Sequence, residues 1–309
     1  MIGWLCKIII RGLGHLPLQL RRKCGYVLGW FFSFVPTKDR LIARYQMDYF
    51  LRKEGGSAHL RKMYAVLGQS VFEALNLRPI LECAASCITF PNRELMESLS
   101  CRGRPVVALT AHTGNWELLA AYIARLGVPL AAVASMTRLD WLQGALMEMR
   151  CGLGIKTIWR GGMSALWEID EELEKGGVVA ALIDQDTRVS SVFTPFFGRP
   201  VKSPSALITL GKRYEALFVS AFIFRTGFGR YKIYLEELDG SLSVEGILTE
   251  YNLRLERLIR RYPYQWVWFH KRWRSLPRLG TMKSEKYILY LEEGLPEAPE
   301  YVAKFFLKE

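Results

Sequence analysis

The middle of the chain alternates short apolar runs with longer stretches in which apolar positions recur every three or four residues. Runs of this length are typical of buried strands, and the longer spacing is typical of helices. Strands are predicted at 105–111, 130–135, 156–159, 178–183, 217–224 and 231–238, and helices at 115–126, 141–150, 163–175, 203–214 and 244–262. Alternating strands and helices predict an α/β fold with a mostly parallel central sheet flanked by helices. The strand at 231–238 is a candidate for an antiparallel neighbour, and Ser203-Pro204 fits an N-cap and first-turn proline.

The N-terminal part has a different pattern. Residues 39–77 are predicted to be helical with a break at Gly55-Gly56. Before them, the apolar and aromatic run from Cys24 to Pro36 is shorter than the about 20 residues that cross a bilayer. It is typical of a segment that lies on a membrane or dips into it. The alternative, one spanning helix over residues 4–35, would hold several arginines within the bilayer.

Charge adds to this picture. The chain carries a formal net charge of +12, and residues 1–65 hold twelve Lys or Arg against three acidic residues. Such a region suits an anionic membrane surface or a nucleic acid, and the apolar neighbours favour the membrane. The six cysteines lack zinc-site spacing, which predicts reduced thiols and no disulfide framework.

A candidate catalytic group follows the first strand of the sheet, in "LTAHTGNWELL". His112 comes directly after the strand, Gly114 permits a sharp turn, Asn115 is a candidate N-cap, and Glu117 lies in the first helical turn. A neutral imidazole whose second nitrogen is held by a carboxylate can take a proton from a hydroxyl group. The alternative is that both residues only serve the end of the helix.

Two later segments carry further polar groups. In "LIDQDTRVSSVFTPFFGRP", acidic and basic side chains at a strand end precede three phenylalanines, which predicts a site with one polar and one apolar wall. A hydrophobic loop tucked under the sheet is the alternative for the phenylalanines. "YPYQWVWFHKRWR" interleaves aromatic and basic residues, which suits a membrane interface or a phosphate-bearing ligand. A segment that stacks on nucleic-acid bases would show the same alternation of aromatic and basic residues, but no nucleic-acid-binding motif accompanies this one.

Taken together, "AHTGNWE" and these two segments resemble the late acyltransferases of lipid A biosynthesis, in the lysophospholipid acyltransferase superfamily with its H-x-x-x-x-[DE] motif. The resemblance covers roughly residues 15–278. It implies a glycerolipid acyltransferase-like fold and transfer of a fatty acyl chain from acyl carrier protein to a hydroxyl of a lipid A precursor. It also implies His112 as general base, Glu117 as the residue that orients it, and Arg150 as the group that stabilises the oxyanion.

The resemblance also implies a domain division, partners and substrate-binding residues. The chain divides into an N-terminal membrane-anchoring segment (1–38), an acyltransferase domain (39–278) and a C-terminal extension (279–309). The expected partners are acyl carrier protein, a membrane glycolipid and the cytoplasmic face of the inner membrane, without nucleic acid, metal or other cofactor. The expected substrate-binding residues are Asn115, Arg160, Asp184, Asp186, Arg188, Phe193, Phe196, Phe197, His270 and Arg272.

Three alternatives stay open at this point. The acceptor could be a lysophospholipid or an aminolipid, and the donor a coenzyme A thioester. A non-catalytic basic protein that binds membranes or nucleic acid would share the charge pattern.

Overall fold

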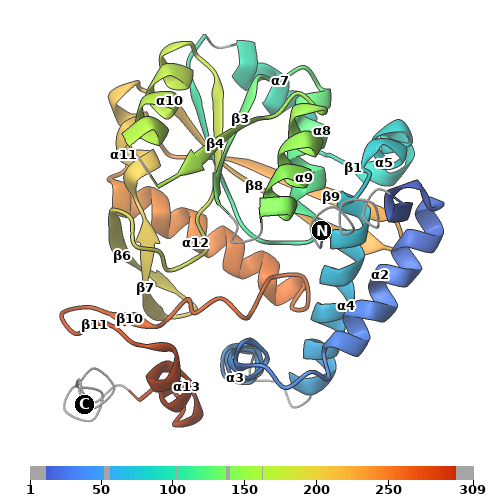
Figure 1. Ribbon diagram of the computed structural model, residues 1–309. Coiled ribbons are helices and arrows are strands. Elements are labelled where there is room, and N and C mark those ends of the chain that lie inside the picture. Colours follow the sequence, from blue (N-terminus) through green and yellow to red (C-terminus); the bar gives the residue numbers. More distant parts are fainter. Residues whose placement is uncertain (1–11, 52–55, 102, 137–139, 162, 297–309) are drawn as a thin grey trace.

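The structure, a computed structural model, describes residues 12–51, 56–101, 103–136, 140–161 and 163–296 (Figure 1). A seven-stranded sheet lies at its centre, in the order β1-β9-β8-β2-β5-β3-β4. Its strands are β1 (Ile88–Thr89), β2 (Val106–Thr110), β3 (Leu130–Ser135), β4 (Lys156–Arg160), β5 (Val178–Leu182), β8 (Leu217–Gly227) and β9 (Arg230–Leu238). Neighbouring strands are parallel except for β8 and β9, which form an antiparallel pair. The predicted α/β fold with a mostly parallel sheet is confirmed.

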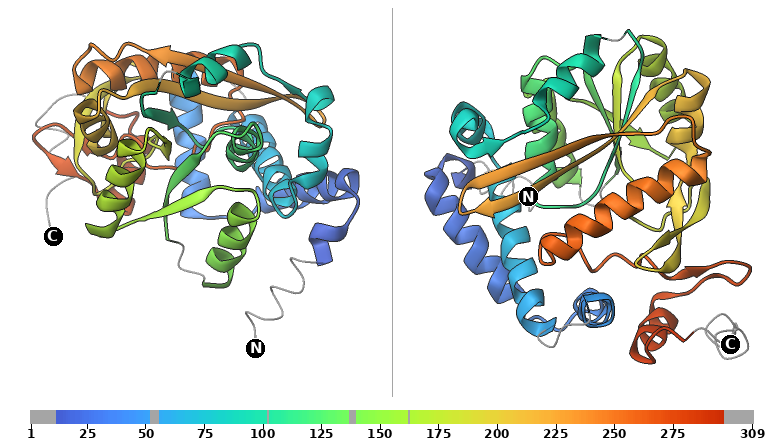
Figure 2. Two further views of the ribbon diagram at one scale, coloured as in Figure 1. Left: turned by 90° about the horizontal axis from the view of Figure 1, so that it is seen from above. Right: turned by 180° about the vertical axis from the view of Figure 1, so that it is seen from behind.

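Helices cover both faces of this sheet because successive strand residues point to opposite sides. Val107 and Leu109 of β2 belong to one buried cluster, whereas Val106 and Ala108 belong to the other. The right view of Figure 2 shows α12 running across one face. The helices of that face are α10 (Met163–Glu174), α11 (Ala206–Arg213) and α12 (Val244–Arg261). The opposite face packs against α5 (Arg78–Glu82), α7 (Arg93–Cys101) and α8 (Trp116–Arg125), and the short α6 (Ala84–Cys87) and α9 (Asp140–Cys151) complete the connections.

The N-terminal helices pack beside this core. They are α2 (Leu18–Phe32), α3 (Lys38–Leu51) and α4 (Gly56–Ala74). Helices α2 and α4 lie side by side (Figure 1), and a side chain in place of Gly29 or Gly68 would collide with the facing backbone. The glycines therefore set how closely the two helices approach. Among the described residues, no helix has both the length and the apolar character needed to cross a membrane.

Two of the N-terminal arginines are not available to lipid headgroups. Arg21 and Arg22 are 0% and 3% exposed. Arg21 donates to the carbonyl oxygens of Leu16 and Asn76, and Arg22 donates to Glu73. Their positive charge serves the packing of α2 on α4, which corrects the expectation that the whole basic N-terminal region faces a membrane.

The phenylalanine-rich segment forms a hairpin that sequence analysis did not predict. Strands β6 (Ser191–Phe196) and β7 (Arg199–Pro204) pair in antiparallel fashion. Ser203 pairs with Val192 and Pro204 with Ser191, so the two residues end a strand and α11 begins at Ala206. The assignment of Ser203-Pro204 as a helix start was wrong because strand pairing with the upstream segment outweighs the local capping signal.

The aromatic segment at 262–274 is mostly core. Trp266, Trp268 and Trp273 are at most 1% exposed and pack with Phe196 and Phe197. These tryptophans are therefore closed to membrane or nucleic acid. Beyond them, β10 (Ser275–Leu276) and β11 (Gly280–Thr281) form a small hairpin, and α13 (Ser284–Glu292) packs against α3.

Candidate active site

The turn between β2 and α8 carries His112 at the carboxyl edge of the sheet. Gly114 has φ +51°, and a Cβ there would collide with the carbonyl of Ile223. Only glycine accommodates both conditions. The Asn115 side chain accepts a hydrogen bond from the Leu118 amide at 3.1 Å. The predicted sharp turn and N-cap are confirmed, and the main-chain path that positions His112 follows from them.

Backbone contacts from the 262–274 segment hold this turn. The Val267 amide donates to the carbonyl of His112 at 3.2 Å, and the Gly114 amide donates to the carbonyl of Gln265 at 2.8 Å. The Ser70 hydroxyl of α4 donates to the carbonyl of Gly114 at 2.8 Å. The turn is thus fixed by two elements far from it in sequence.

A buried cluster of charged residues contacts the turn through the side chain of Asn115. Glu73 is 0% exposed, and it accepts hydrogen bonds from Asn115, Arg22, Arg225 and Tyr231. Burial alone would raise the pKa of Glu73, but the Arg225 guanidinium and the hydrogen bonds hold it below its ordinary value. The carboxylate therefore stays charged and ties α2, α4, β8 and β9 to the start of α8.

His112 is oriented by Asp184, not by Glu117. His112 Nδ1 lies 2.8 Å from Asp184 Oδ1, and the His112 amide donates to Asp184 Oδ2 at 2.9 Å. Asp184 follows β5, which is the parallel neighbour of β2, so both residues lie at the same edge of the sheet. Glu117 therefore does not orient the imidazole as expected, and Asp184 takes that place.

The surroundings of Asp184 keep its carboxylate ionised. It is 0% exposed, and its Oδ2 also accepts a hydrogen bond from Trp266 Nε1 at 2.8 Å. Burial alone would raise the pKa of its carboxyl group, but interactions with His112 and then His270 hold the pKa well below its ordinary value. An ionised Asp184 requires the proton of His112 on Nδ1, which leaves the Nε2 lone pair facing outward.

Glu117 forms a two-point ion pair with Arg150 at the end of α9. Arg150 Nε and Nη2 donate to the Glu117 carboxylate at 3.0 and 2.6 Å. The third guanidinium nitrogen, Nη1, is buried and has no hydrogen-bond partner among the described residues. Arg150 also lines the pocket beside His112. Glu117 thereby fixes a guanidinium that retains one unused donor.

Gln185 and His270 cover the free nitrogen of His112. Gln185 Nε2 lies 3.2 Å from His112 Nε2 and 3.0 Å from His270 Nε2, so its N–H groups donate to both rings. Burial, followed by the His112 charge, lowers the pKa of His270 to about 3. His270 is therefore neutral at physiological pH. Sequence analysis selected His270 but missed Gln185, although Gln185 lies between two acidic residues that it did select.

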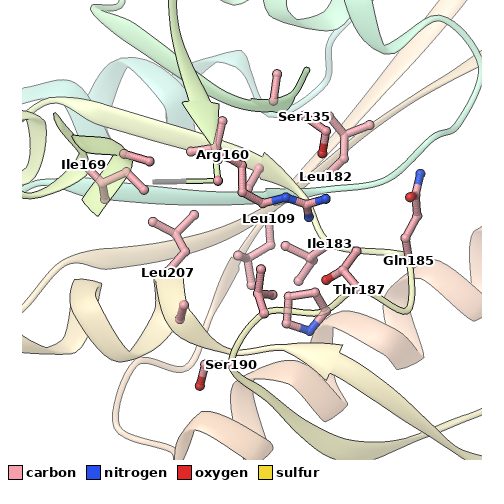
Figure 3. A pocket seen from close by; sticks show the side chains of 18 of the residues that line it. Leu109, Ser135, Arg160, Ile169, Leu182, Ile183, Gln185, Thr187, Ser190 and Leu207 are labelled. Carbon is pink, nitrogen blue, oxygen red and sulfur yellow. The ribbon is translucent and has the colours of Figure 1, made fainter. Parts of the chain in front are cut away.

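An apolar pocket of about 620 Å³ extends from this polar cluster. In Figure 3, Gln185 lies at one end, and Ile169 of α10 and Leu207 of α11 lie at the other. The wall between them includes Leu109 of β2 and Ile183, which directly follows β5. A pocket with apolar walls and a few convergent polar groups is the usual form of a small-molecule site.

The three phenylalanines lie outside this pocket. Phe196 and Phe197 are buried in the aromatic core, and Phe193 of β6 is 38% exposed. The pocket is lined instead by α10, α11 and the sheet. The prediction that the phenylalanines line an apolar wall was wrong because the β6–β7 hairpin directs Phe196 and Phe197 toward the tryptophans and leaves Phe193 exposed.

The other expected binding residues separate into two groups. Arg160 lines the pocket with an exposed side chain. Asn115 and Arg272 are buried, and Arg272 donates to the Lys202 carbonyl and to Ser203 Oγ of β7. Asp186 pairs with Arg274 at 3.6 Å, and Arg188 is exposed in the following loop. Neither Asp186, Arg188 nor Arg272 lines the pocket, so their expected role in binding has no geometric support there.

No group of three or more His, Cys, Asp or Glu side chains within the described ranges has an arrangement that could hold a metal ion. The arrangement at His112 is suited to moving a proton, because an ionised buried acid holds one nitrogen of the imidazole and a neutral, displaceable amide lies at the other.

Comparison with known proteins identifies the family of the chain. Residues 1–275 match the model of the bacterial lipid A biosynthesis acyltransferase family. The chain is also 26% identical over 189 residues to a phosphatidylinositol mannoside acyltransferase of Mycolicibacterium smegmatis (strain ATCC 700084 / mc(2)155). That match covers 58% of this chain and 62% of the relative, less than two thirds of its length. The family match covers the turn that carries His112, the pocket and the aromatic segment, and the chain belongs to the bacterial lipid A biosynthesis acyltransferase family.

Proposed function

We propose that this protein transfers a fatty acyl chain from a thioester to a hydroxyl of a membrane lipid, with His112 as general base and Asp184 as the residue that orients it. The observation that carries the proposal is the position of His112. Its imidazole is held through Nδ1 by a buried carboxylate and lies at the polar end of an apolar pocket. An acyl chain fits such a pocket because burial of apolar surface is the main source of its binding energy.

The reaction follows from this geometry. The acceptor hydroxyl replaces the Gln185 amide at His112 Nε2 and gives its proton to that nitrogen as its oxygen attacks the thioester carbonyl. The tetrahedral intermediate then collapses, the carbon–sulfur bond breaks, and His112 returns the proton to the leaving thiolate. Asp184 stabilises the imidazolium that exists between the two steps. Direct attack by the acceptor requires no covalent acyl-enzyme.

Arg150 is the candidate for oxyanion stabilisation. Arg150 lines the same pocket as His112, its Nη1 has no hydrogen-bond partner among the described residues, and Glu117 holds the rest of the guanidinium in place. Replacement by lysine keeps the charge but loses the fork geometry. We expect Arg150→Lys to lower kcat by about 10²-fold or more, the usual effect of losing one oxyanion donor, with little change in KM.

The control for this prediction is Arg125→Lys, because Arg125 is exposed at the end of α8. It should retain wild-type kcat. Full activity of Arg150→Lys, with an unchanged melting temperature, would remove Arg150 from the mechanism.

The proposed donor is acyl carrier protein, and the proposed acceptor is a lipid A precursor or a related glycolipid at the cytoplasmic face of the inner membrane. Family membership supports the glycolipid, and the net charge of +12 supports both partners. Acyl carrier proteins are acidic, and glycolipid precursors carry phosphates, so opposite charge would speed their encounter. The Mycolicibacterium smegmatis relative bears the name of a phosphatidylinositol mannoside acyltransferase, which favours a sugar hydroxyl as acceptor.

The donor and acceptor can be tested in one assay with the purified full chain. Acyl carrier protein and coenzyme A thioesters of mixed lengths are offered with a tetra-acylated lipid A precursor, a lysophospholipid and an aminolipid. Mass spectrometry should detect a new ester on the glycolipid, formed faster from acyl carrier protein. A product only on another lipid would overturn the proposed acceptor, and equal rates with coenzyme A would overturn the donor.

The proposed membrane contact is the outer face of α2 and the turn after it. Its apolar side chains are 38–59% exposed and include Leu20, Tyr26, Val27, Leu28, Trp30, Phe31, Phe32, Phe34 and Val35. An apolar face with Trp and Tyr is typical of a helix that lies in the membrane interface. Exposure of so many large apolar groups together on a water-facing surface would otherwise be costly.

Two substitutions on one side of α2 test this contact. Leu28 and Phe31 are 54% and 59% exposed. We expect Leu28→Ser with Phe31→Ser to weaken binding to anionic vesicles by at least about tenfold in cosedimentation, because each side chain contributes about 1.5–3 kcal/mol when fully buried. Leu253→Ser, at a 60% exposed position on α12, is the matched control and should bind normally. Equal vesicle binding by both variants would contradict α2 as the contact.

A further inference from the structure

The C-terminal helix α13 lies beyond the part of the chain that matches the family, which ends at residue 275. It is nevertheless well docked against α3 (Figure 1). Tyr287, Tyr290 and Leu291 are at most 3% exposed. At its two ends, Glu285 pairs with Lys38 at 2.6 Å and Glu292 accepts from Tyr45 at 3.1 Å. The surface of α3 is thus specifically complementary to α13.

A hydrogen-bonded relay leads from α13 toward His112. The Tyr287 hydroxyl donates to Gln46 Oε1 at 2.6 Å. Gln46, which is 0% exposed, donates through Nε2 to the carbonyl of Trp268 and, at 3.0 Å, to the carbonyl of His270. The His270 ring then contacts Gln185, and Gln185 contacts His112.

The Tyr287 hydroxyl decides which way the Gln46 amide points. A glutamine amide has an oxygen on one side and two N–H donors on the other, and a donor at the oxygen side excludes the flipped orientation. Burial raises the pKa of Tyr287 well above its ordinary value, so the hydroxyl remains a donor at all physiological pH values. The N–H groups of Gln46 are therefore kept on the two carbonyls.

The residues around His270 have two further attachments to the C-terminal segment. Lys271 Nζ donates to Ser284 Oγ at 2.7 Å, and the Met282 amide donates to the carbonyl of Arg274 at 2.9 Å. Lys271 and Arg274, which follow His270 closely, are thus held by residues that come after position 281. The segment between α12 and β10 forms no helix or strand of its own, so these contacts help to fix its shape, together with its contacts to the turn at His112 and to β7.

We propose that α13 is a positioning element of the active site, in which Tyr287 acts through Gln46 to hold His270 beside His112. This inference rests on the proposed acyl-transfer function of that site. Tyr287 and Gln46 are positioning residues, because neither lines the pocket. A small displacement of the polar groups around the reacting atoms costs rate even when binding is retained.

Tyr287→Phe in the full chain tests the proposal, since it removes one oxygen and keeps the ring. We expect kcat to fall by about tenfold with KM for both substrates nearly unchanged, because the pocket is intact while the reacting geometry is loosened. The matched control is Tyr290→Phe, in the same helix and equally buried, whose hydroxyl donates to the Pro296 carbonyl at 3.3 Å. It should keep wild-type kcat.

A double-mutant cycle separates positioning from general destabilisation. Gln46→Met retains the shape of the side chain, and its effect on kcat should not add to that of Tyr287→Phe, because both break one relay. The effects of Gln46→Met and Tyr290→Phe should add.

Two results would overturn the inference. One is equal kcat in Tyr287→Phe and Tyr290→Phe, and the other is full additivity in the Tyr287–Gln46 cycle. Absence of acyl transfer by the wild-type protein would instead overturn the proposed function, so the two failures are distinguishable.

Discussion

Asp184→Asn is expected to lower the rate constant of acyl transfer by about 10⁴-fold, the loss typical of a catalytic triad whose acid is replaced by its amide. Asparagine has almost the same size, so the pocket and KM should change little. The amide cannot hold the proton on His112 Nδ1 as a carboxylate does, and it cannot stabilise the imidazolium that forms when the acceptor gives up its proton. Steady-state kinetics over a range of both substrates measures the effect.

The matched control lies two residues further along the same loop. Asp186→Asn removes a carboxylate that pairs with Arg274 at 3.6 Å and does not line the pocket. It should leave kcat within about threefold of wild type, as expected for a substitution away from the reacting atoms. If Asp184→Asn and Asp186→Asn were equally active, the dyad of His112 and Asp184 would have no catalytic role.

His112→Ala has the second large expected effect. Loss of a general base typically costs about 10²–10⁴-fold in rate, and no neighbouring group is placed to replace it. His270 is the nearest imidazole, with ring centroids 4.7 Å apart, but its Nε2 contacts Gln185 and no described carboxylate orients it. Its pKa of about 3 also makes it a weak base. The variant should therefore bind acyl donor normally and transfer almost nothing.

The fold of His112→Ala is expected to survive, because the main-chain contacts of the turn do not involve the imidazole. The Val267 amide, the Asp184 carboxylate and the Ser70 hydroxyl all bond backbone atoms of the turn. His15→Ala, at an exposed position, is the matched control and should be fully active. Substantial activity in folded His112→Ala would contradict the proposed mechanism.

Local signals in the sequence were sufficient for the turn that carries His112. The apolar run before it, the glycine, the N-cap asparagine and the following helix all act within a few residues. They predicted β2, α8, and the place of His112 at the edge of the sheet. The same reasoning predicted the six main strands, because most of them are buried parallel strands with short apolar runs, and β9 alternates buried and less buried residues.

The partner of His112 could not be predicted in the same way. Glu117 is near in sequence, but the first turn of α8 directs it toward Arg150. Asp184 is 72 residues away and reaches His112 only because β5 is the neighbour of β2 in the sheet. Strand order depends on the whole chain, and no local pattern specifies it.

The aromatic residues were predicted to be exposed or to bind a ligand, but most of them are buried. Phe196, Trp266 and Trp273 resemble surface or ligand-binding residues when basic neighbours are counted with them, yet they form one buried cluster. Their neighbour Arg272 is buried too, with β7 supplying its hydrogen bonds. A segment in which charged and aromatic residues alternate is exposed only when its charged groups are in contact with water.

The role of His112 is tested most directly by a mass-spectrometric comparison of wild-type protein and His112→Ala in acyl transfer from acyl carrier protein thioesters to a lipid A precursor. We expect the wild-type protein to add the mass of one ester-linked acyl chain to the glycolipid, and the folded variant to add none. Equal product from both proteins would contradict the role of His112, and no product on any lipid acceptor with the wild-type protein would contradict the function itself.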